Sequence, residues 1–169
     1  CQLTVLFMLA LKAAADRQTL SPDAIADHLS NLRALPGLVN QALNAEPQIS
    51  IAAGKLAEAR DILFLGRGRM FPLALEGALK LKEISYIHAE AYPGGELKHG
   101  PLALVDSKMP VIAVAPNNDL LSKLKANLSE VSARGGKLYV FADESIKFES
   151  DRSCRVINVP NCPDILDPI

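Results

Sequence analysis

The chain has 169 residues, of which 49% are hydrophobic and 22% charged, and its formal net charge is −1. This length and composition predict one packed globular domain rather than a disordered chain. The charges form no basic block, and five Phe, three Tyr and no Trp leave few platforms for stacking bases, so neither a nucleic acid nor a membrane is expected as a partner.

The three cysteines, Cys1, Cys154 and Cys162, are odd in number and match no common zinc spacing. Only three histidines are present to assist them, so we expect no metal site and no other cofactor. Cys1 is followed by an apolar, helix-like run, and we do not expect it to be a nucleophile. Reduced thiols fit a cytoplasmic location best.

The first part of the chain predicts helices only. The apolar run at 3–11 is too short to span a bilayer and has no positive flank before it, so it predicts a helix over 2–17. Ser21-Pro22 is a helix start, with serine as the cap and proline at the first position. We predict helices from there to Leu32, over 36–44, and from Pro47 to about residue 60.

From residue 61 onward the pattern alternates between strands and helices. Apolar runs predict five short strands, with helices between them over 71–85 and 117–134; the strands are 61–65, 88–92, 111–115, 137–142 and 156–160. This order predicts an α/β three-layer sandwich with a five-stranded, mainly parallel, doubly wound sheet, preceded by a helical segment. We place the helical segment at 1–46 and the α/β domain at 47–169. Ligands of such sheets bind outside the carboxyl ends of the strands.

The helix over 71–85 carries Glu76, Lys80 and Glu83 at spacings of four and three, so all three project from one face. Lys80 lies between the two carboxylates and can reach either. An exposed, ion-paired helix face gives the same pattern, and spacing alone favours that ordinary interpretation.

Two glycine-containing turns are candidates for binding or chemistry. Lys98-His99 is held between Gly94-Gly95 and a Gly-Pro pair, beyond a strand end, where a histidine can move protons near neutral pH; a polar loop with a capping histidine is the alternative. Gly66-Arg67-Gly68 can present backbone N–H groups to an anion, although a tight strand-to-helix turn is the commoner origin of such a motif.

Four segments closely resemble the glutamine-dependent fructose-6-phosphate amidotransferase family: LFLGRG at 63–68, LEGALKLKEIS at 75–85, HAEAY at 88–92 and GELKHGP at 95–101. The resemblance implies the second sugar isomerase (SIS) domain of such an enzyme. Residues 1–46 would then link it to the first SIS domain, with a glutaminase domain further upstream in the parent chain. The implied ligands are fructose 6-phosphate and glucosamine 6-phosphate.

The resemblance also implies roles for particular residues. Glu83 matches the base that moves a proton between C1 and C2 of the opened sugar. Lys80 would keep that carboxylate ionised, with Glu76 orienting Lys80. His99 matches the histidine of ring opening, which the family presents across a dimer interface, so a homodimer with His99 near the interface is expected. Gly66, Arg67 and Gly68 remain the candidates for binding substrate.

The family's phosphate loop belongs to the first SIS domain, and its tail lysine would lie beyond Ile169. With no initiator methionine either, we expect the chain to be a fragment with little or no activity of its own. The alternative is a non-catalytic SIS module that binds or senses phosphosugars.

Overall fold

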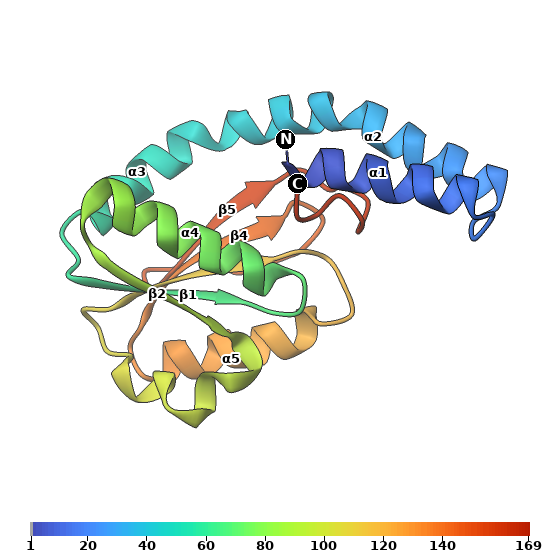
Figure 1. Ribbon diagram of the computed structural model, residues 1–169. Helices are drawn as coiled ribbons and strands as arrows, with labels where there is room; N and C mark the ends of the chain where they lie inside the picture. The colour runs from blue at the N-terminus through green and yellow to red at the C-terminus, as the bar shows by residue number, and fades with distance from the viewer. Residues whose placement is uncertain (1) are drawn as a thin grey trace.

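The computed structural model describes residues 2–169, so Cys1 and the expectation about it lie outside the described residues. The chain begins with α1 (Gln2–Asp16) and α2 (Pro22–Ala42), which pack against each other as a helical hairpin beside the sheet (Figure 1). Within residues 2–169, no helix is both long and apolar enough to cross a membrane.

The predicted start of α2 is confirmed, whereas the predicted break in it is wrong. Ser21 is extended and its hydroxyl accepts a hydrogen bond from the Ala24 N–H at 3.2 Å, which satisfies one of the free donors of the first turn. Pro36 then lies inside one continuous helix of 21 residues. Proline removes one intrahelical hydrogen bond, but the turns on both sides are intact and carry the helix across it.

After α2 the chain continues through η1 (Leu43–Ala45) into α3 (Glu46–Leu56). Both η1 and α3 pack against the sheet. Ala45 and Ala52 are 6% and 3% exposed and belong to the core on one face of the sheet. The division of the chain at residue 46 stays a prediction.

The sheet has five strands: β1 (Asp61–Gly66), β2 (His88–Pro93), β3 (Pro110–Ala115), β4 (Lys137–Asp143) and β5 (Cys154–Val159). Their order is β2-β1-β3-β4-β5 and every pairing is parallel. The predicted three-layer α/β architecture with a doubly wound sheet is therefore confirmed. β5 begins two residues earlier than the apolar run predicts, because Cys154 and Arg155 pair with β4.

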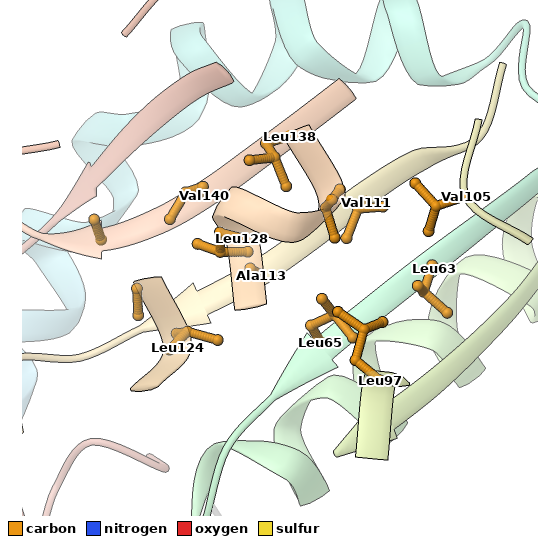
Figure 2. Packing of buried hydrophobic residues seen from close by; sticks show 13 residues of the cluster. Leu63, Leu65, Leu97, Val105, Val111, Ala113, Leu124, Leu128, Leu138 and Val140 are labelled. Atoms are coloured by element: carbon orange, nitrogen blue, oxygen red, sulfur yellow. The ribbon is translucent and has the colours of Figure 1, made fainter. Parts of the chain in front are cut away.

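Each face of the sheet has its own core. α3 and α4 (Met70–Ser85) cover one face, where Phe64, Ala74 and Ala78 are buried together. The other face is covered by α5 (Leu121–Ala133) and two short 3₁₀ helices, η2 (Gly94–His99) and η3 (Pro101–Leu104). Figure 2 shows that second core, in which Leu63 and Leu65 of β1 meet Leu97 of η2. The helices of the two layers lie above and below the sheet in Figure 1.

Candidate functional site

The three predicted residues of α4 form one ion-paired cluster on the outer face of the helix. The face of α4 toward the sheet is made by Ala74 and Ala78, which are 1% and 2% exposed. Glu76, Lys80 and Glu83 lie on the opposite side of the helix, so their side chains point outward. Lys80 Nζ lies 2.8 Å from Glu83 Oε2 and 3.8 Å from Glu76 Oε1. The ammonium group therefore bridges two carboxylates, as the spacing predicts.

The cluster keeps Lys80 charged. The hydrogen bond to Glu83 and the negative charge of that carboxylate raise the pKa of Lys80 above its ordinary value, with Glu76 adding to the effect. A protonated lysine thus places a positive charge 2.8 Å from the Glu83 carboxylate.

This cluster lies at the surface of the described chain. The Lys80 and Glu83 side chains are 54% and 52% exposed. Exposed apolar side chains surround it on the same helix and just beyond its end: Leu75, Leu79, Ile84 and Tyr86. An exposed apolar surface of this kind around charged side chains is typical of an interaction surface.

The second candidate, the Gly66–Gly68 turn, connects β1 to α4. A Cβ atom on Gly66 would lie 2.1 Å from the Met70 carbonyl oxygen, so the close approach of strand and helix requires glycine there. Gly68 has a φ of 56°. The Met70 and Phe71 N–H groups donate to the carbonyls of Arg67 and Gly68, so the turn itself uses these helix donors. Packing thus accounts for both glycines, and a role in binding substrate stays a prediction.

Arg67 points into the protein rather than out of the turn. Its Nη1 donates a 3.0 Å hydrogen bond to Oδ1 of Asn127, a buried residue of α5. The neighbouring crevice at the carboxyl ends of β1 and β3 is lined by leucines of the segment leading into α5 and of the helix itself, namely Leu120, Leu121 and Leu124. Arg67 and Asn118 also line this crevice, which lies where doubly wound sheets ordinarily hold a ligand.

The third candidate, His99, is the last residue of η2 and is exposed. Within residues 2–169 its imidazole has no hydrogen-bond partner, so both ring nitrogens are available to a ligand. Gly100 follows with a φ of 142°, which restricts this position to glycine. Lys98, beside it, forms a 2.9 Å ion pair with Glu130 of α5.

The structure separates the three candidates. Arg67 precedes the first turn of α4 whereas Glu83 is in its last, roughly 20 Å apart at about 1.5 Å per residue. His99 is on η2, which packs on the opposite face of the sheet from α4. One hexose phosphate bound to this chain therefore cannot contact the turn and Glu83 together. Only Glu76, Lys80 and Glu83 are brought into one cluster.

A cleft of about 1000 Å³ lies at the amino ends of the strands and contains none of the predicted site residues. Its lining is mixed in charge and includes Lys55, Arg60, Asp61, Lys137, Asp151 and Arg155. Among residues 2–169 no three histidine, cysteine or acidic side chains gather as metal ligands would.

Sequence reasoning missed Asn127 and Glu130, which lie behind the His99 segment. The signal that points to Asn127 is a polar residue in the apolar stripe of α5, between the buried Leu124, Leu128 and Val131. Glu130 follows one turn later on the same helix and gives no comparable sequence signal.

Comparison with known proteins agrees with the resemblance drawn from the four motifs. The SIS domain family model matches residues 55–163. The chain is 54% identical over 168 residues to the glutamine–fructose-6-phosphate aminotransferase (isomerizing) of Xanthomonas campestris pv. campestris, and 55% identical to that of Bordetella pertussis. Each match covers 99% of this chain and 28% of the relative, so the chain spans less than a third of the curated relatives it matches.

The solved C-terminal domain of glucosamine-fructose-6-phosphate aminotransferase from Francisella tularensis superposes with a TM-score of 0.92 at 45% identity. That match covers 96% of this chain and 46% of the solved chain.

Proposed function

The chain belongs to the SIS domain family, and we propose that it is the second SIS domain of a longer enzyme that makes glucosamine 6-phosphate from fructose 6-phosphate and ammonia released from glutamine. The observation that carries this proposal is the Glu76–Lys80–Glu83 cluster on α4, in which an ammonium group is held 2.8 Å from the proposed base. Identity of 54% over 99% of the chain to an enzyme named for this reaction supports it.

In the proposed reaction, the sugar ring opens and ammonia adds at the C2 carbonyl, which loses water to give an imine. Glu83 removes a proton from C1 while the imine nitrogen takes up a proton, which gives an enolamine. Glu83 then returns its proton to C2, and the C1 hydroxyl releases a proton that replaces the one taken up by nitrogen, so that an aldehyde and an amine form. A single carboxylate can do both because the two carbons are adjacent. Lys80 keeps Glu83 ionised before the step and stabilises negative charge on the sugar oxygen during it. Glu76 orients Lys80.

We propose that His99 acts on the ring oxygen and the C2 hydroxyl during ring opening, in the site of a second copy of the chain. The support is geometric, because η2 and α4 pack on opposite faces of one sheet. A homodimer in which each copy lends its histidine to the other, and a site completed by the first SIS domain, would cover the exposed surface around Glu83.

The remaining assignments follow from the same proposal. The reaction would be the first step of hexosamine biosynthesis, with the glutaminase domain in the same polypeptide supplying ammonia. A cytoplasmic location is supported by Cys154 and Cys162, which are both free thiols.

A second candidate is a SIS module that binds a phosphosugar without changing it. The observation that favours it is the solvent exposure of Lys80 and Glu83 in the described chain. The two candidates differ in what they require of Glu83: a binding module needs no proton acceptor there.

The decisive experiment is Glu83→Gln in the full-length enzyme. The amide keeps the shape of the side chain but cannot take a proton, so glucosamine 6-phosphate formation should fall by at least about 100-fold, as loss of general acid–base catalysis typically does. Glutamine hydrolysis should continue, because the glutaminase site lies in another domain. Glu58→Gln, at an exposed glutamate outside the Glu76–Lys80–Glu83 cluster, is the matched control. Product formation by Glu83→Gln at the control's rate contradicts the proposal.

A further inference from the structure

The element that carries His99 cannot hold its own position. η2 has six residues, and 3₁₀ helices have weak hydrogen-bond geometry and are rarely stable alone. It begins at two glycines and is followed by Gly100, residues that have no side chain with which to anchor the backbone. The place of the imidazole must therefore be set by contacts that η2 makes with its neighbours.

Contacts with α5, β1 and the β1–α4 turn help to hold η2 on the protein. Leu97 is 0% exposed and lies in the core with Leu65 (Figure 2). Below the first turn, Asn127 faces Gly94, and the guanidinium of Arg67 lies under Gly95. At the other end of η2, next to His99, the Lys98–Glu130 ion pair connects η2 to α5.

The Lys98–Glu130 pair differs from an ordinary surface ion pair. The Glu130 side chain is 28% exposed against 63% for Lys98, so the carboxylate is the partner drawn toward the core. Oε1 lies 2.9 Å from Lys98 Nζ, and within residues 2–169 Oε2 is buried without a hydrogen-bond partner. A carboxylate that has lost water on one oxygen depends on its single cation, because separating the pair would leave a buried charge uncompensated.

We propose that Glu130 is a positioning residue for His99: by fixing Lys98 at the end of η2, it sets where the next residue presents its imidazole. This inference rests on the proposed role of His99 in ring opening. Glu130 does not touch the sugar. Its effect passes through the backbone between Lys98 and His99, so its loss should impair the histidine's step and spare the proton transfer at Glu83.

The test separates these steps by choice of substrate in the full-length enzyme. Fructose 6-phosphate closes its ring through the C5 hydroxyl, so the analogue without that hydroxyl stays open and needs no ring opening. Glu130→Gln should lower kcat for fructose 6-phosphate by about 10- to 100-fold, the cost of a displaced catalytic group. The value of KM and turnover of the 5-deoxy analogue should change little. Glu149→Gln, at an exposed glutamate of the loop between β4 and β5, is the control.

Exchange of the two charges tests whether the ion pair itself, rather than either side chain alone, positions His99. Lys98→Glu alone should reproduce the Glu130→Gln defect, and Lys98→Glu with Glu130→Lys should recover most of the lost kcat. Equal loss on both substrates, no loss on either, or failure of the exchange to restore ring opening overturns the inference. If Glu130→Gln lowers the melting temperature, the kcat of the exchange variant for fructose 6-phosphate decides whether the ion pair positions His99.

Failure of the proposed function would look different. His99→Ala slowing both substrates alike would remove the histidine from ring opening, and activity in Glu83→Gln would remove the base. Either result is seen without any change at Glu130.

Discussion

Truncation of Leu97 to alanine should detach η2 from the core and destabilise the whole domain. Leu97 is 0% exposed and is the one η2 side chain in the cluster it shares with Leu63, Leu65 and Val111. Removing its outer carbons loses their burial and leaves a cavity between β1 and η2, which the rigid sheet closes only in part.

The expected loss is about 3 kcal/mol, near the middle of the range of about 2–5 kcal/mol measured for buried leucine-to-alanine changes. For a chain of 169 residues this lowers the melting temperature by about 6–12 °C. With a slope of about 2 kcal/mol per molar urea, the unfolding midpoint shifts by about 1.5 M. Urea titrations followed by far-UV circular dichroism measure both midpoint and slope.

Leu104→Ala is the matched control, because Leu104 is on the adjacent 3₁₀ helix and is 58% exposed. Its cost should stay within about 0.5 kcal/mol. If the two variants lose similar stability, or if Leu97→Ala loses less than about 1 kcal/mol, η2 is not anchored by this side chain and the reasoning about the placement of His99 fails.

The remaining predictions concern one glycine and one thiol. Gly66→Ala places a Cβ 2.1 Å from the Met70 carbonyl oxygen and should lower the free energy of unfolding by more than about 3 kcal/mol. Gly37→Ala, in open space on α2, should raise it by about 0.5–1 kcal/mol. Thermal melts compare the two variants, and equal effects contradict the assignment of close packing at Gly66. Burial and the Asp167 carboxylate raise the pKa of Cys162 to about 12, so this thiol should resist iodoacetamide at pH 9 in the folded protein and react in urea. Its contribution to stability is complete below 9.0, the ordinary thiol pKa, and is lost as pH rises from there to about 12; labelling at equal rates in both states refutes this.

Local signals predicted much of the fold. The apolar runs of β1 and β3 are read directly because strands inside a parallel sheet are buried on both faces. Ser21 marks the start of α2 through a hydrogen bond that depends only on neighbouring residues. Pro36 misled the prediction because its local cost is outweighed by the intact turns on both sides of it.

The site was predictable only where it is local. Glu76, Lys80 and Glu83 share a helix, so their spacing fixes their contact. The partners of Arg67 and Lys98 are 60 and 32 residues away in sequence, at Asn127 and Glu130, and depend on how α5 packs against the sheet. The separation of α4 and η2 onto opposite faces also depends on the order of the strands, which no single segment encodes.

That order of strands bears on how the polypeptide assembles during synthesis. β1 pairs with both β2 and β3, so the sheet cannot begin to form until β1, which ends at residue 66, has left the ribosome. Every later strand joins by a crossover and never by a hairpin, which makes each pairing distant in sequence and slow to form. The β1–α4–β2 unit is the earliest piece that can close. Until β3 is synthesised, the edge of β1 that will pair with it is unpaired and apolar. This nascent intermediate is therefore the species most prone to aggregate and most dependent on a chaperone.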